Sequence, residues 1–166
     1  MFHLPIEPLT AEAFAPYGDI VETTGAPLII NAGYAQRFND LAAVDIATED
    51  GEACVSIFTA RARELPLTIT MMERHPLGSQ AFMPLQNNAW MVIVCEDPGE
   101  PASYRAFTAT GLQGVNYARG TWHFPLVTFH DGDRFMVVDR KGPGNNLDER
   151  VLPCGTPIVV SRREKK

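Results

Sequence analysis

Glycine and proline interrupt this chain so often that long regular elements cannot form in it. The sequence has 13 of each among 166 residues, and they are spread along the chain rather than gathered in one linker. The segments between them are short, rich in β-branched and aromatic residues, and repeat at roughly 8–12 residues, a pattern typical of a β-sandwich or β-barrel. These strand-like segments are residues 67–73, 90–95, 104–108, 114–118, 125–130 and 134–140.

Local patterns add detail to this all-β prediction. Residues 90–95 are apolar without interruption, which predicts a strand buried on both faces. The Asp-Gly pair within residues 130–133 is a strong hairpin signal. Near the start of the chain, Thr10 is suited to cap a helix that Pro16 would end after little more than one turn. Residues 19–23 then alternate like an edge strand.

Composition excludes several classes of protein. Lys plus Arg is 14 and Asp plus Glu is 20, so the net charge is −6, which disfavours binding to nucleic acid or to an anionic membrane. The longest apolar run, residues 89–95, is far shorter than the roughly 20 residues of a spanning helix. The N-terminus lacks a basic segment followed by an apolar stretch, so we expect no signal peptide. We expect one domain over residues 1–160 and a flexible, charged tail over 161–166.

The cysteines point to a reducing compartment. There are three, Cys54, Cys95 and Cys154, and they form neither a C-x-x-C pair nor a zinc-binding spacing. We therefore expect reduced thiols in a cytosolic protein.

The first unusual polar segment lies near residue 75. If residues 67–75 form one strand, its odd-numbered positions share a face, because side chains alternate with a period of two. That face is apolar at its start, which assigns Met71 to the core and Met72 to the outside. The same alternation directs Glu73 and His75 inward, where a carboxylate and an imidazole need a ligand or each other.

The second polar segment lies near residue 123. His123 follows Gly120 by three residues, at a turn between two predicted strands. His75 and His123 thus both stand beside a turn at a strand end, each with polar neighbours. Either histidine taken alone is as well explained by a structural hydrogen bond, but the pair together favours a site.

These two segments resemble the two conserved motifs of the cupin superfamily. Glu73 stands where the first motif has its first histidine, His75 matches the second, and Gln80 stands in place of the glutamate. Gly120 and His123 match the Gly-x-x-His of the second motif. The resemblance implies an all-β, cupin-like antiparallel β-barrel, or double-stranded β-helix, with a short N-terminal helix. It also implies that Glu73, His75, Gln80 and His123 hold a divalent metal, more weakly than the usual ligand set, or that the site works without metal.

A longer resemblance narrows the family. Residues 73–82, 114–117, 122–126 and 138–140 are similar to ureidoglycolate lyases, and the similarity extends over about residues 5–150. The resemblance implies a cytoplasmic homodimer that cleaves (S)-ureidoglycolate to glyoxylate and urea in the allantoin branch of purine breakdown. It also implies nickel as the metal.

That reaction requires a base, an acid and a cationic group for the substrate carboxylate. His75 or His123 is suited to be the base, and Glu73 to orient an imidazole or ligate metal. Asp139 shares a face with apolar residues of its strand, so it faces the pocket or pairs with an arginine. The side chains suited to bind substrate are Arg37, Asn116, Tyr104, Asp139 and Lys141, with Arg74, Arg119 and Arg140 as further options for the carboxylate.

Two other functions remain open at this point. One is a different cupin enzyme, such as a metal-dependent sugar isomerase, an oxygenase or an amidohydrolase. The other is a small-acid-binding module that has the pocket but no catalysis.

Overall fold

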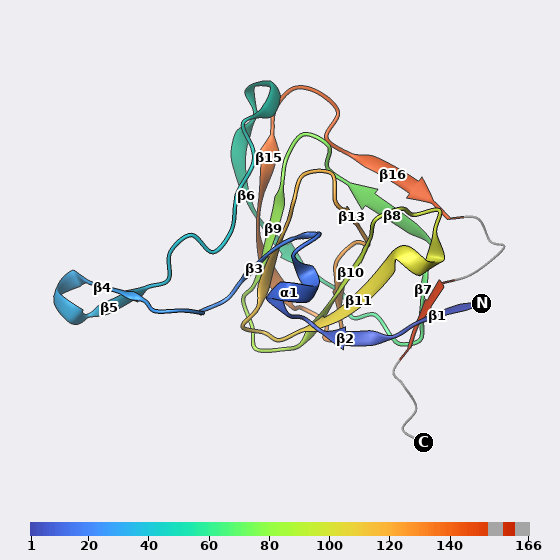
Figure 1. Ribbon diagram of the computed structural model, residues 1–166, viewed down its shortest axis with the longest axis horizontal. Helices are drawn as coiled ribbons and strands as arrows, with labels where there is room; N and C mark the ends of the chain where they lie inside the picture. The colour runs from blue at the N-terminus through green and yellow to red at the C-terminus, as the bar shows by residue number, and fades with distance from the viewer. Residues whose placement is uncertain (153–157, 162–166) are drawn as a thin grey trace, which may run out of the picture.

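The computed structural model describes residues 1–152 and 158–161 (Figure 1). Nearly all of its regular structure is β-strand, as predicted, and α1 (Ala11–Phe14) is the one α-helix of the described residues. The Thr10 hydroxyl accepts the backbone N–H of Ala13 at 3.3 Å, which confirms the predicted cap. Three short 3-10 turns complete the helical structure, and they are η1 (Asn31–Gly33), η2 (Thr48–Asp50) and η3 (Pro101–Ser103).

A seven-stranded sheet lies at the centre of the fold. Every residue of β10 (Trp90–Cys95) is buried, as its uninterrupted apolar sequence predicted. β14 (Val127–Thr128) pairs with β10 beside the main path of the sheet. In order, the remaining strands are β16 (Asp148–Val151), β8 (Met71–Arg74), β13 (Trp122–His123), β10, β11 (Tyr104–Ala109) and β2 (Ile6–Pro8).

A five-stranded sheet packs against one face of the seven-stranded sheet. Its order is β3 (Gly18–Val21), β12 (Gly114–Tyr117), β9 (Gln80–Pro84), β15 (Arg134–Lys141) and β6 (Glu52–Thr59), so β3 is the predicted edge strand. Alternate residues of the two sheets meet between them in the first core cluster. Its largest fully buried members are Phe14, Trp90, Phe107 and Phe135.

A three-stranded sheet covers the other face of the seven-stranded sheet. It consists of β1 (Phe2–Leu4), β17 (Ile158–Val160) and β7 (Leu67–Ile69). The second core cluster lies here and includes Ile69, Met72, Met91, Ile93 and Val160. β10 therefore contributes Val92 and Val94 to one cluster and its odd-numbered residues to the other, which is why it is apolar throughout.

β4 (Leu28–Ile30) and β5 (Ala35–Arg37) pair only with each other among the described strands. Figure 1 shows this hairpin projecting from the body of the molecule beyond β3. We call β4, β5 and the turn between them the arm.

Two local predictions were wrong. Residues 67–75 form two strands in different sheets, because the chain crosses from the three-stranded to the seven-stranded sheet at Thr70. The crossing changes the alternation, so Met72 and not Met71 is the buried methionine. The turn at residues 130–133 forms no hairpin, since β14 pairs with β10 whereas β15 pairs with β6 and β9.

The structure has the all-β, cupin-like fold that the sequence predicted. Cys54 and Cys95 are free thiols, while Cys154 and residues 162–166 of the predicted tail lie outside the described residues. Across the described part of the chain, we find no helix with the length and apolar character needed to cross a membrane.

Candidate active site

The structure brings His75 and His123 together from separate β-segments. His75 directly follows β8, and His123 ends β13. The centroids of the two rings are 5.3 Å apart, with 42° between their planes. Glu73 lies directly across the strand pair from His123, so the register of β8 and β13 places the carboxylate beside the His123 imidazole.

Backbone carbonyls orient both imidazole rings in the same way. Nδ1 of His75 lies 2.7 Å from the carbonyl oxygen of Asn146, and Nδ1 of His123 lies 2.9 Å from that of Thr121. A carbonyl only accepts, so each Nδ1 carries the proton and donates it. In the neutral rings, the lone pair is therefore on Nε2, and both Nε2 atoms belong to the group that they form with Glu73.

His123 is the more isolated of the two imidazoles. Its side chain is 2% exposed, and its Nε2 has no hydrogen-bond partner among the described residues. The nearest acceptor is Oε1 of Glu73 at 3.4 Å. A buried ring nitrogen without a partner is costly in a core, which indicates a place for a proton, a ligand or a metal.

Glu73 remains ionised in this environment. Burial alone would raise the pKa of its carboxyl group, but the close approach of His123 and the positive charges that His123 and His75 carry when protonated outweigh burial. The pKa of Glu73 therefore lies below its ordinary value. The site thus has a stable negative charge beside its two imidazoles.

Gln80 and Asp139 extend the polar group along the five-stranded sheet. Nε2 of Gln80 donates to Oδ2 of Asp139 at 3.2 Å, and this directs Oε1 of Gln80 toward Nε2 of His75, also at 3.2 Å. Asp139 thus faces the site and holds Gln80, rather than pairing with an arginine. Gln80 and Phe82 both point into the fold.

Tyr117 forms the apolar wall behind His123. The two rings are stacked with centroids 4.1 Å apart and 10° between their planes. Burial, with a smaller effect of the Glu73 charge, raises the pKa of the Tyr117 phenol far above its ordinary value. Tyr117 therefore stays neutral and serves to position the imidazole.

A pocket of about 560 Å³ opens beside this group. Glu73 and Gln80 line its polar end, and each of them contacts one imidazole. Arg61 and Arg63 line the same pocket, and sequence reasoning missed both. Their spacing of two residues was the only available signal, because it places two guanidinium groups on one side of an extended segment.

The other residues proposed for substrate binding lie elsewhere. Arg37 is on the arm. Asn116 points away from the first core cluster and donates to Asp19 and to the carbonyl of Ala43. Tyr104 is in the second core cluster, where its hydroxyl donates to the carbonyl of Pro98 at 3.0 Å. Lys141 forms an exposed ion pair with Glu52 at 3.3 Å.

The remaining arginine options are already bound to other groups. Arg74 pairs with Asp148 at 2.9 Å and stacks on Trp122, on the opposite side of β8 from Glu73. Arg119 pairs with Asp45 at 2.6 Å. Arg140 is buried and donates to the carbonyls of Thr48, Glu49 and Pro143.

The donor set fits a divalent transition metal. Glu73, His75 and His123 each offer one ligand atom, and these atoms lie within 4.8 Å of one another. Two imidazole nitrogens and a carboxylate oxygen are common ligands for nickel, zinc or iron. The unpartnered Nε2 of His123 and the second nitrogen of each ring, fixed by a carbonyl, are what a histidine ligand requires. The oxygen of Gln80 lies beside this set as a weaker ligand.

Comparison with known proteins identifies the family. The ureidoglycolate lyase family model matches residues 1–160. The chain belongs to the ureidoglycolate lyase family. A ureidoglycolate lyase of Pseudomonas entomophila strain L48 is 52% identical over 161 residues, which cover 95% of this chain and 96% of that protein.

Relatives in other bacteria are equally similar. The ureidoglycolate lyase of Pseudomonas syringae pv. tomato is 53% identical over 160 residues, which cover 95% of this chain and 94% of the relative. That of Burkholderia mallei strain NCTC 10229 is 52% identical over 152 residues, covering 90% and 89%. As a member of the ureidoglycolate lyase family, the chain is an enzyme, and the group around His75 and His123 is its candidate catalytic centre.

Proposed function

We propose that this enzyme cleaves (S)-ureidoglycolate into glyoxylate and urea. The observation that carries the proposal is the group formed by His75, His123 and an ionised Glu73, because Glu73 also lines a pocket that contains Arg61 and Arg63. The family membership agrees with this chemistry. A sugar isomerase or a binding module without catalysis has no comparable support.

The reaction is the collapse of a carbinolamide. Ureidoglycolate carries a hydroxyl, a carboxylate and a ureido nitrogen on one carbon. A base removes the hydroxyl proton, the electron pair forms the aldehyde carbonyl of glyoxylate, and the carbon–nitrogen bond breaks. An acid protonates the departing nitrogen to give urea, so one proton moves from oxygen to nitrogen and the atoms balance.

We assign the base to His123 and the acid to His75. Nε2 of His123 has a lone pair and no hydrogen-bond partner in the described residues, and Glu73 stabilises the imidazolium that forms. Both nitrogens of His75 face acceptor oxygens, those of Asn146 and Gln80, so its protonated form satisfies both contacts. Transfer of protons by two positioned groups supplies about 100-fold or more in rate.

The substrate carboxylate is assigned to Arg61 and Arg63. Both line the pocket that contains Glu73 and Gln80. No ion pair joins either guanidinium to a carboxylate of the described residues, whereas Arg74, Arg105, Arg119 and Arg150 are all paired. A planar guanidinium binds a carboxylate at two points, which also fixes the orientation of the hydroxyl.

We further propose that the site binds nickel through Glu73, His75 and His123, with Gln80 as a weaker ligand. A bound divalent ion would polarise the hydroxyl and carboxylate oxygens of the substrate and lower the pKa of the hydroxyl. The same nitrogen atoms hold either the ion or the proton. Measurement of metal content alongside activity therefore decides which form is the working enzyme.

We propose a cytoplasmic homodimer in which residues 1–160 act as one domain. The free thiols of Cys54 and Cys95 suit a reducing compartment. The family model matches the same range of residues as the proposed domain.

The test is analysis of the products. Purified enzyme is supplied with racemic ureidoglycolate, and urea, glyoxylate and ammonia are quantified over time. We expect urea and glyoxylate in equal amounts from half of the racemate, with no ammonia. Ammonia as the first nitrogen product would instead identify an amidohydrolase, and binding of glyoxylate without turnover would identify a binding module.

A further inference from the structure

Part of the outer face of the five-stranded sheet is apolar and exposed, whereas residues 43–49 cover its polar side chains Asn116 and Arg140. The outer face consists of the side chains of that sheet that point away from the first core cluster. Strand register places Val21, Gly114, Met83, Met136 and Ile57 in one row across all five strands. Ile57 is 55% exposed and Met136 is 37% exposed. A sheet face that stays in water normally alternates to polar residues, so a continuous apolar row indicates a contact surface.

β6 carries the most exposed of these outward apolar side chains. Its outward side chains are Ala53, Val55 and Ile57, and Val55 is 66% exposed. Its inward side chains Cys54 and Ser56 are polar or weakly polar and only partly buried, while Phe58 packs against Phe82. β6 therefore presents exposed apolar side chains on the side that faces away from the core, which an unpartnered edge strand normally avoids.

The arm is also apolar and exposed. Leu28, Ile29 and Ile30 of β4 are exposed, and Tyr34 at the tip is 93% exposed. No residue from 23 to 40 is buried. Between Thr23 and Ala42, no hydrogen bond or ion pair joins the chain to the body of the molecule, as far as the described residues extend. A two-stranded hairpin alone is at best marginally stable in water, so the arm needs a surface to lie on.

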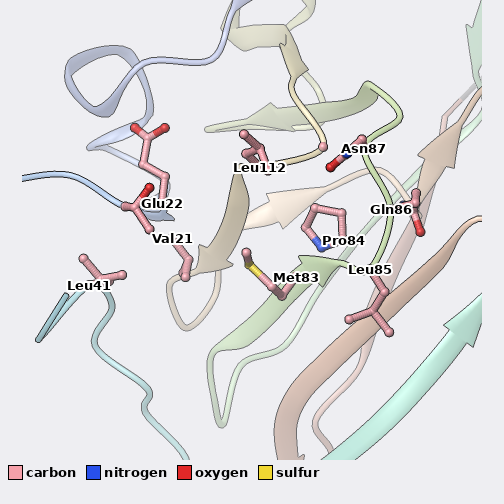
Figure 2. Close-up of a pocket in the computed structure, with 11 residues that line it drawn as sticks. Val21, Glu22, Leu41, Met83, Pro84, Leu85, Gln86, Asn87 and Leu112 are labelled. Carbon is pink, nitrogen blue, oxygen red and sulfur yellow. The ribbon is translucent and has the colours of Figure 1, made fainter. Parts of the chain in front are cut away.

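A pocket of about 450 Å³ lies at the root of the arm. Val21, Thr23 and Leu41, from the two chain segments that lead into and out of the arm, form one side of it. Figure 2 shows Met83, Pro84 and Leu112 on the other side, facing the same space. Met83 belongs to the apolar row, so this arm-root pocket is continuous with the outer face.

The arm and the arm-root pocket carry charges of opposite sign, which favours contact between them. Arg37 is the single charged residue between residues 23 and 39, in a chain of net charge −6. Glu22 is the single charged residue that lines the arm-root pocket. No ion pair joins Arg37 to another described residue. The two charges are complementary, and Arg37 lies on β5 of the arm, which projects from the body of the molecule (Figure 1).

We propose that the outer face is the surface on which a second copy of this chain docks, with the arm of each copy lying in the arm-root pocket of the other. A two-fold axis brings the same patch of both copies together, so it requires a self-complementary surface. The arm and its receiving pocket are adjacent on one chain, which meets that requirement. The proposal rests on the homodimer named above but not on the reaction.

Sedimentation velocity of the full-length protein tests the surface. The wild type should sediment as a dimer of the 18.3 kDa chain at micromolar concentration. Ile57→Lys and Ile29→Lys should each halve the mass by placing an unpaired charge in the contact. Val151→Lys is the matched control, because Val151 is 79% exposed on β16, in another sheet, and this variant should remain dimeric. Circular dichroism checks that each variant is folded.

Hydrogen exchange tests the arm separately. The backbone amides of residues 28–37 should exchange at least about tenfold more slowly in the wild-type dimer than in Ile57→Lys, because docking removes them from water. A monomeric wild type, or a dimer that survives both substitutions, would overturn the proposed surface. If the arm amides exchange at equal rates in the dimer and in the monomer, the arms do not dock on the other copy, and that part of the proposal is wrong. Each of these results leaves urea release by the wild type untouched.

Discussion

The environment of His123 explains how an ordinary imidazole becomes reactive at this position. Nδ1–H donates to the carbonyl of Thr121, Tyr117 covers one face of the ring, and Nε2 is left without a hydrogen-bond partner among the described residues. The acidic group beside it is Glu73, and a carboxylate cannot satisfy an unprotonated nitrogen. Nε2 therefore gains a partner only when a proton, a substrate or a metal arrives.

The arginines of the pocket give the first prediction at this scale. Arg61→Gln and Arg63→Gln should each raise the KM for ureidoglycolate about tenfold or more, because each removes a charge-assisted hydrogen bond to the carboxylate. Steady-state kinetics of urea release measure this. Arg74→Gln is the control, since Arg74 pairs with Asp148 outside the pocket and its loss should leave KM unchanged. An unchanged KM in both pocket variants would contradict the assignment.

The cysteines give a second prediction. Burial raises the pKa of the Cys95 thiol to about 12, so at pH 8 almost none of it is thiolate, which is the reactive form. Iodoacetamide at pH 8 should therefore modify partly exposed Cys54 in the folded protein and leave Cys95 unmodified until denaturant is added. Peptide mass spectrometry measures both sites. Equal labelling of Cys95 and Cys54 in the folded enzyme would show that Cys95 is accessible.

At the scale of elements, the close approach of β3 and β12 depends on a glycine. Gly18 has a φ of +147°, and a Cβ placed there would overlap the carbonyl oxygen of Asn116 on the paired strand. The substitution Gly18→Ala should therefore separate the strands as well as strain the backbone.

Guanidinium unfolding measures this effect. Gly18→Ala should destabilise the protein by about 2–3 kcal/mol more than Gly132→Ala. Gly132 is the matched control, because its φ of +82° is also strained for alanine but no atom lies within 4 Å of the added Cβ. Equal losses would mean that the strands adjust without cost.

The elements that sequence analysis predicted well are those whose pattern reflects a local rule. The cap at Thr10, the doubly buried β10 and the edge strand β3 all follow from residues within the element itself. The errors at Thr70 and at residues 130–133 arose where the chain changes sheets, because neither alternation nor turn residues specify which sheet a strand joins.

The candidate site was likewise predictable where a local sequence pattern marks its residues, and not elsewhere. Glu73, His75, Gln80 and His123 stand at strand ends beside turns, and motif spacing identified them. Arg61 and Arg63 reach the pocket through the bridge between Ala62 and Thr128, which is a contact between segments distant in sequence. The two-residue spacing of these arginines does not specify such a contact, so the sequence analysis named other arginines.

At the scale of the whole molecule, two packed sheets supply the residues of the site, and the core clusters hold these sheets in place. The seven-stranded sheet supplies Glu73 and His123, and the five-stranded sheet supplies Gln80 and Asp139. The site therefore exists only while the two sheets stay packed, and binding at the site should stabilise the entire fold.

Nickel binding tests this coupling. With the ion at about 100 times its Kd, the Tm of the metal-free wild type should rise by about 5–10 °C. The shift should disappear in Glu73→Gln and in His123→Ala. It should persist in His3→Ala, whose histidine is exposed on β1 of the three-stranded sheet. Calorimetry gives the Tm, and elemental analysis gives the bound metal. A wild type without any shift would exclude the proposed ligand set.

The most direct test of the central claim is the rate of urea release from ureidoglycolate by His75→Ala and His123→Ala. Each variant should be slower than the wild type by at least about 100-fold while remaining folded, because each loses one of the two groups that move the proton. His3→Ala should retain the wild-type rate. Wild-type turnover in both His75→Ala and His123→Ala would contradict the proposed active site.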